Sequence, residues 1–270
     1  MNDALGDALC DDGAAVAGWY GKLPSLGDFA ARRLSDAFVA PWDAWLAQRV
    51  AETQHALGAD WLSLYLTCPV WRFFAMPGAI APTLAHCWTG VVMASVDRVG
   101  RHFPLTIAAA LPNAPATGGE VAALWQWLSA IEGVALAALD FDHTVERLDA
   151  QLAALPLPLP PPARNGTPAA LLHEPWIVSS ASALPDALTR LFAPVWQTEI
   201  YGMSMWTSAQ GALDASRDLA DPQDSTVALV PGTPPVSVAP DAAPRPFTIW
   251  PTYGLPDTAL FTTMLRDGAS

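Results

Sequence analysis

Basic residues are scarce in this sequence. Lys22 is the sole lysine, and Lys and Arg together number 13 against 26 Asp and Glu. The formal net charge is therefore -13 at pH 7, and the pI is near 4.5. Proteins that bind nucleic acid neutralise its phosphates with Lys and Arg, and anionic membrane surfaces attract clusters of the same residues. This balance excludes nucleic acid as the main partner and disfavours a charged membrane surface.

Cysteines are also few, and their spacing fits no disulfide scaffold. Cys10, Cys68 and Cys87 are odd in number and form no CxxC pair, which predicts a reducing compartment. The opening stretch, MNDALGDALCDDG, contains four aspartates and no Lys or Arg. A secretory signal instead begins with basic residues and continues with apolar ones. Both observations predict a cytoplasmic location.

An uninterrupted apolar segment of membrane-spanning length is missing too. The longest stretch without Asp, Glu, Lys or Arg runs from Phe73 to Val96, but two prolines, a glycine and a histidine interrupt it. No continuous helix over this stretch could satisfy its backbone hydrogen bonds in lipid. We therefore expect no membrane insertion, and we interpret the stretch as loop and strand in a buried core.

What the sequence does contain is enough apolar material for a large core. Of its 270 residues 52% are hydrophobic and 14% charged, a composition that excludes a disordered chain. Trp88 to Val96 and Phe103 to Leu111 are rich in strand-forming residues and predict a hairpin. Helical patterns alternate irregularly with strands, and one of them begins near Pro41 and ends at Gly58. The expected fold class is mixed α/β, a three-layer α-β-α sandwich around a central mixed sheet that contains this antiparallel hairpin.

The predicted organisation is one domain with variable segments. Residues 1–16 are expected to form a flexible acidic tail, and residues 17–267 a single domain. The proline-rich segment 155–162 (LPLPLPPP) predicts an extended, stiff spacer across the surface. Residues 221–246, rich in Pro, Asp and Ala, predict a long, partly mobile insertion.

Sequence motifs of common enzymes are incomplete. GWYGKL at residues 18–23 has two residues where a phosphate-binding loop needs four between its glycine and Gly-Lys. Ser204 lacks one glycine of a nucleophile elbow. The aspartates of residues 140–143 (DFDH) could ligate a metal, but helix capping explains them as well. These patterns favour neither a cofactor nor a metal site.

Two polar clusters stand out in apolar surroundings. The first is GKLPSLGDFAARR, which begins at Gly21, and the second is SVDRVGRHFPLT, which begins at Ser95. Because buried charges are rarely unpaired, ion pairs such as Asp97 with Arg101, or Asp28 with Arg101, are expected. The clusters either pin loops to the sheet or form a recognition surface that presents arginine donors.

The same stretches carry a family resemblance. GKLPSLGDF, PVWRFFA (residues 69–75), SVDRVGRHFPLT and the terminal GLPDTALFTTML resemble the type VI secretion system-associated protein TagF. These motifs follow the family order from residue 18 to about residue 266. The resemblance extends to Trp206, the one tryptophan that this chain keeps of a pair in the family's tail motif.

The resemblance implies a fold, a function and a set of residues. The implied fold is an α-β-α sandwich. The implied function is that of a cytoplasmic, non-enzymatic repressor that restrains the type VI secretion system after translation by binding its forkhead-associated scaffold protein. No cofactor is implied, and the oligomeric state stays open. The candidate residues, for partner binding or for the fold, are Gly21, Lys22, Pro24, Gly27, Asp28, Phe29, Asp97, Arg98, Gly100, Arg101 and Trp206.

An enzymatic alternative uses some of the same residues. A hydrolase or phosphatase-like enzyme could use Asp28, Asp97 and His102 in a cleft. General acid–base work requires side chains within hydrogen-bond reach, about 3 Å, of the groups they serve. This alternative therefore predicts that the three side chains converge.

Overall fold

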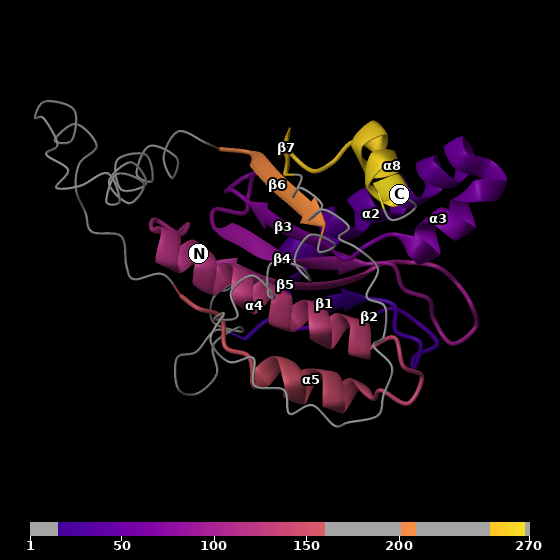
Figure 1. Ribbon diagram of the computed structural model, residues 1–270, viewed down its shortest axis with the longest axis horizontal. Coiled ribbons are helices and arrows are strands. Elements are labelled where there is room, and N and C mark those ends of the chain that lie inside the picture. The colour runs from indigo at the N-terminus through magenta and orange to yellow at the C-terminus, as the bar shows by residue number, and fades with distance from the viewer. Residues whose placement is uncertain (1–15, 160–200, 209–248, 268–270) are drawn as a thin grey trace, which may run out of the picture.

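The computed structural model describes residues 16–159, 201–208 and 249–267. The described strands form one seven-stranded sheet in the order β2-β1-β5-β4-β3-β6-β7 (Figure 1). They are β1 (Gly18–Gly21), β2 (Ala30–Arg32), β3 (Trp71–Ala75), β4 (Cys87–Met93), β5 (Leu105–Leu111), β6 (Met203–Ser208) and β7 (Trp250–Tyr253). The helices are α2 (Asp36–Leu57), α3 (Trp61–Thr67), α4 (Gly118–Ala137), α5 (Val145–Ala153) and α8 (Thr258–Asp267).

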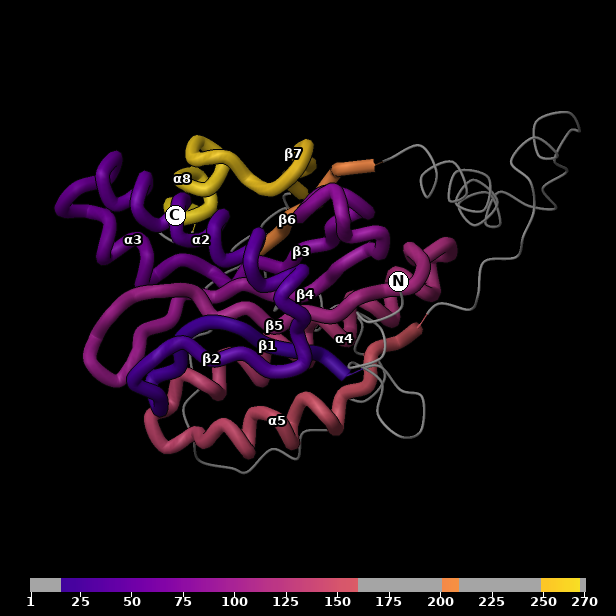
Figure 2. The backbone as a smooth tube through the Cα atoms, turned by 180° about the vertical axis from the view of Figure 1, so that it is seen from behind, coloured from indigo at the N-terminus to yellow at the C-terminus, as the bar shows by residue number. Residues whose placement is uncertain are grey.

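Helices cover both faces of this sheet. Helices α4 and α5 lie on one face, and α2, α3 and α8 lie on the other (Figures 1 and 2). Two separate clusters of buried apolar residues fill the two spaces between helices and sheet. The α/β class is thereby confirmed, and the placement of helices on both faces agrees with the predicted three-layer α-β-α arrangement. The sheet differs from the expected mixed one, because each described pairing is antiparallel.

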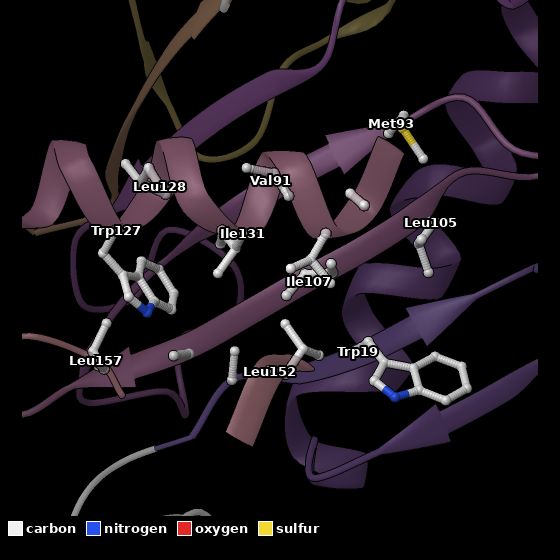
Figure 3. Close-up of a cluster of buried hydrophobic side chains, with 14 of the residues drawn as sticks. Trp19, Val91, Met93, Leu105, Ile107, Trp127, Leu128, Ile131, Leu152 and Leu157 are labelled. Carbon is white, nitrogen blue, oxygen red and sulfur yellow. The ribbon is translucent and has the colours of Figure 1, made fainter. Parts of the chain in front are cut away.

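The core beneath α4 and α5 is built from alternate residues of the central strands. Val91 of β4 and Ile107 of β5 point toward Ile131 of α4 and Leu152 of α5, and all four are fully buried (Figure 3). Thr117 begins α4 as its N-cap, with its hydroxyl accepting from the backbone N–H of Glu120 at 3.2 Å. Thr117 opens the stretch TGGE (residues 117–120), and a threonine three residues before a glutamate is a capping-box pattern.

The core on the opposite face is largely aromatic. Trp42 of α2 contacts Phe73 of β3 at a ring-centroid distance of 4.9 Å. Trp206 of β6 lies 5.3 Å from Phe73 in a stacked arrangement and is fully buried. Trp71 of β3 is buried in this core as well, whereas Trp45 of α2 and Trp125 of α4 are only partly buried.

A buried ion pair fixes α4 against β3. The Arg72 guanidinium of β3 is 2% exposed and lies 2.8 Å from the Glu132 carboxylate of α4. The Trp125 ring covers the same guanidinium at 4.3 Å. Burial raises the pKa of Glu132 although the arginine opposes that shift, so desolvation offsets part of what the ion pair contributes.

Several local predictions can be compared with these elements. The hairpin of β4 and β5 is confirmed, with Gly90 opposite Ala108, and Gly58 ends α2 as expected. The expected helix start at Pro41 is wrong. The helix begins at Asp36, because burial of Phe38 extends the apolar face one turn earlier, and Pro41 lies inside it.

The variable segments fall mostly outside the described residues. The predicted tail is described only at Val16, and the predicted insertion 221–246 is not described. The spacer is described through residue 159, and that part lies against the protein. Leu157 is buried in the core, and the Trp127 indole N–H donates to the Leu155 carbonyl at 3.0 Å.

Candidate docking surface

Two loops that are far apart in the sequence meet at one end of the sheet. One connects β1 to β2 and the other connects β4 to β5. The Arg98 N–H donates to the Leu26 carbonyl at 2.9 Å, and the Ser95 hydroxyl donates to the Lys22 carbonyl at 2.8 Å. The backbone of each loop is therefore held by the other.

A buried carboxylate locks the two loops together. Asp97, whose side chain is 0% exposed, lies 3.1 Å from the Lys22 ammonium and 2.6 Å from Arg101 Nε. Its other oxygen accepts from the backbone N–H groups of Val99 and Arg101 at 3.0 and 2.8 Å. Burial alone would raise the pKa of Asp97, but these hydrogen bonds and the two cations outweigh it and hold the pKa well below its usual range. Asp97 is thus an anchor that is ionised at neutral pH.

The two cations on this anchor differ in exposure. Lys22 is buried, whereas the Arg101 side chain is 56% exposed and also donates from Nη2 to the Gly27 carbonyl. The predicted pair of Asp97 with Arg101 is confirmed. The alternative pair of Asp28 with Arg101 is not among the ion pairs of the described chain. Sequence reasoning missed Lys22 with Asp97, which no local spacing indicates.

The first loop packs against an aromatic cluster through Phe29. Phe29 packs against Phe103 at 4.7 Å and against Tyr20 at 6.0 Å, and the Lys22 ammonium lies 4.9 Å from its ring. The Tyr20 hydroxyl donates to Asp43 of α2. Burial, followed by that carboxylate, raises the pKa of Tyr20, so this tyrosine stays a neutral donor. One edge of Phe29 remains in solvent, with 44% of the residue exposed.

The tips of both loops form one exposed surface. Val99 is 70% exposed and Phe29 44%, and charged and glycine residues surround them. We call this the paired-loop surface; its members are Gly27, Asp28, Phe29, Arg98, Val99, Gly100 and Arg101, all of which are exposed. Aromatic residues and arginine are enriched at protein interfaces, and this surface presents Phe29 and two arginines.

The candidate residues that remain are buried in the fold and do not belong to this surface. Gly21 adopts a φ of 135°, and a Cβ there would lie 2.2 Å from the Pro104 carbonyl oxygen, so only glycine fits. Pro24 is buried. Trp206 is buried in the aromatic core, and its indole N–H donates to the Ser204 hydroxyl at 2.9 Å.

The residues of the enzymatic alternative do not converge. Asp28 Oδ1 accepts from the adjacent Phe29 N–H at 2.8 Å, and Asp97 is saturated by its cations and amides. The His102 ring instead packs edge-on against Trp61 of α3 at 5.7 Å. Hydrogen bonds among the described residues join none of these three side chains to another, so the geometry that this alternative requires is not met.

The other motifs with possible chemistry have structural roles. The Ser204 hydroxyl donates to the Gly254 carbonyl at 2.6 Å. Asp140 Oδ1 accepts from the Asp142 N–H at 3.0 Å within a turn, while Thr144 caps α5. Among the described residues no group of three or more His, Cys, Asp or Glu side chains could hold a metal ion. The described helices also include none that is long and apolar enough to cross a bilayer.

A comparison with known protein families identifies the family to which this chain belongs. Residues 18–155, which run from β1 to just beyond α5, match a family described as type VI secretion system-associated. That family is the TagF N-terminal domain, and the chain belongs to it.

A solved structure extends the similarity beyond that domain. The crystal structure of PA0076 from Pseudomonas aeruginosa PAO1 is 31% identical in sequence, with a TM-score of 0.62. The alignment covers 92% of this chain and 93% of that one. A search of curated proteins finds no match.

Proposed function

We propose that this protein is a non-enzymatic, post-translational repressor of the type VI secretion system. It acts in the cytoplasm by binding the forkhead-associated scaffold protein of the machine through the paired-loop surface. Membership of a family associated with this secretion system supports the pathway. The repressor role and the partner are extensions from the family resemblance of the motifs that build this surface.

The observation that carries the choice of surface is its combination of exposure and rigidity. Val99 and Phe29 present apolar area to solvent, while Asp97 fixes both loops through four hydrogen-bonding groups. A frame that is ordered before binding loses little conformational entropy in the complex. Such a surface suits a protein partner over an interface on the order of 1,600 Å².

A secretion assay with matched valine variants tests this proposal. Val99→Asp places a charge in the centre of the paired-loop surface, and Val121→Asp makes the same change on α4, where Val121 is 51% exposed. Neither substitution removes a buried contact, so both variants are expected to fold. In a strain that lacks the gene, wild type and Val121→Asp should restore repression of effector release, and Val99→Asp should not.

Either of two results would contradict the proposal. Unrepressed secretion in the presence of the wild-type protein would refute the repressor role itself. Equal repression by both variants, at equal protein levels, would keep the role but remove the paired-loop surface from it.

A further inference from the structure

The paired-loop surface carries positive charge on an acidic protein. Below it, Lys22 and Asp97 neutralise each other in the interior. On the surface itself, Arg98 and Arg101 are the exposed cations, and Asp28 is the one exposed carboxylate. The whole chain has 13 Lys and Arg against 26 Asp and Glu, so two arginines in one loop tip depart from the general composition of the molecule.

Both arginines have guanidinium N–H groups with no hydrogen-bond partner among the described residues. The backbone of Arg98 is fixed by its bond to Leu26, yet no described residue pairs with its guanidinium. Arg101 uses Nε on Asp97 and Nη2 on Gly27, and its Nη1 has no partner within the described chain. Asp28 forms no ion pair with either arginine among the described residues, and its Oδ1 accepts from the Phe29 N–H in a local turn.

We infer that the partner docks an acidic segment on this surface, with carboxylates reaching Arg98 and Arg101 and an apolar side chain contacting Val99 and Phe29. The inference rests on the proposed function and specifies the chemistry of the partner's epitope. A guanidinium fork matches a carboxylate through two parallel hydrogen bonds. The flanking apolar residues exclude water from that contact and thereby strengthen it.

The overall charge of -13 does not contradict an acidic epitope. At physiological ionic strength the Debye length is about 8 Å, so distant acidic residues are screened while directly contacting groups are not. The global charge must nevertheless be held constant in any test, because it alters association rates with a charged partner. A control with the same charge change outside the paired-loop surface provides this.

Arg98→Glu and Arg147→Glu form such a matched pair. Both residues are exposed, both substitutions lower the net charge equally, and Arg147 lies on α5, outside the paired-loop surface. Arg98→Lys keeps the charge but not the fork. Folding of each variant is verified by circular dichroism and thermal unfolding before binding is measured.

The experiment is a calorimetric titration of the purified forkhead-associated scaffold from the same bacterium into each full-length variant. We expect Arg98→Glu to weaken binding on the order of tenfold or more, Arg98→Lys to weaken it less, and Arg147→Glu to leave it near wild type. Reversing one acidic residue of the scaffold to Lys should restore the affinity of Arg98→Glu.

The possible failures are distinguishable. A wild-type protein that does not bind the scaffold would refute the proposed function, and the inference with it. Wild-type binding that Arg98→Glu and Arg147→Glu weaken equally would overturn the inference alone. Loss of the Arg98-dependent affinity after phosphatase treatment of the scaffold would identify phosphate as the anion and overturn the assignment to carboxylates.

Discussion

The strand pair that carries the first loop depends on one carboxylate of α5. Asp149 Oδ1 accepts from the Trp19 indole N–H and from Arg33 Nη2, both at 2.9 Å. Its Oδ2 lies 3.1 Å from Arg32 Nη1. Trp19 belongs to β1 and Arg32 to β2, so Asp149 joins α5 to both strands. We predict that Asp149→Ala destabilises the protein substantially, while Arg32→Ala does not.

The expected loss of stability follows from how deeply each hydrogen-bond partner of Asp149 is buried. Trp19 is fully buried, so its unpaired N–H costs about 1–3 kcal/mol. The Arg33 side chain is 24% exposed, and water replaces part of its charged bond, which leaves about 1 kcal/mol. The Arg32 side chain is 52% exposed, so its pair contributes under about 1 kcal/mol. Asp149→Ala should therefore lower the free energy of unfolding by about 3 kcal/mol.

Urea denaturation and thermal unfolding measure this directly. A loss of about 3 kcal/mol corresponds to a fall in Tm of roughly 6–12 °C for a domain of this size. Asp149→Asn retains an acceptor for Trp19 and should lie between the alanine variant and wild type. An Asp149→Ala protein no less stable than Arg32→Ala would refute the reasoning, since the buried indole N–H would then have no energetic consequence.

Three further predictions concern backbone space and pH. Gly90→Ala should lower the free energy of unfolding by about 3 kcal/mol or more, because the added Cβ would lie 2.1 Å from the Ile107 carbonyl oxygen in the centre of the sheet. A loss below about 1 kcal/mol in urea denaturation would contradict this. Gly133→Ala should raise the free energy of unfolding by up to about 1 kcal/mol in the same assay. Gly133 lies within α4, where alanine is favoured over glycine, and the added Cβ would meet no atom within 4 Å. A destabilised variant would be the contrary result. Burial, and then the charge of Arg147, lowers the pKa of His143 below its unfolded value, so the folded state prefers the neutral ring. Stability should decrease as pH falls from 7.5 to 5.5, and His143→Gln should flatten that slope in thermal unfolding, whereas an unchanged slope would exclude His143 as its source.

Local sequence patterns predicted those features that depend on contacts between residues close together in the chain. The hairpin of β4 and β5 follows from two nearby stretches rich in strand-forming residues, and the cap at Thr117 follows from a spacing of three residues. The pair of Asp97 with Arg101 is an i,i+4 contact within one loop. In each case the interacting groups lie close together in the chain, so their geometry is fixed by the backbone between them.

The features that sequence reasoning missed depend on tertiary contacts. Lys22 reaches Asp97 only because β1 pairs directly with β5. The short strand β2 follows GDF, where glycine and aspartate indicate a loop, and it exists because it pairs with β1. The start of the proline-rich spacer was expected to cross the surface, yet Leu157 is buried.

The candidate site was predicted in part. The two motif stretches were singled out together, and the structure brings them into contact. Exposure then separates their residues into groups that composition cannot distinguish. Lys22 and Asp97 are buried, while Arg98 and Val99 face solvent. Val99 carried no polar or charged signal in the sequence, although it is the most exposed apolar residue of the paired-loop surface.

The central claim, that the paired-loop surface binds the forkhead-associated scaffold, is tested most directly by one titration. Purified scaffold is titrated calorimetrically into wild type, Val99→Asp and Val121→Asp. The account predicts saturable binding by wild type and Val121→Asp, with affinity reduced at least about tenfold in a folded Val99→Asp protein. Equal affinity of all three proteins would contradict the assignment of the surface, and absence of binding by wild type would contradict the assignment of the partner.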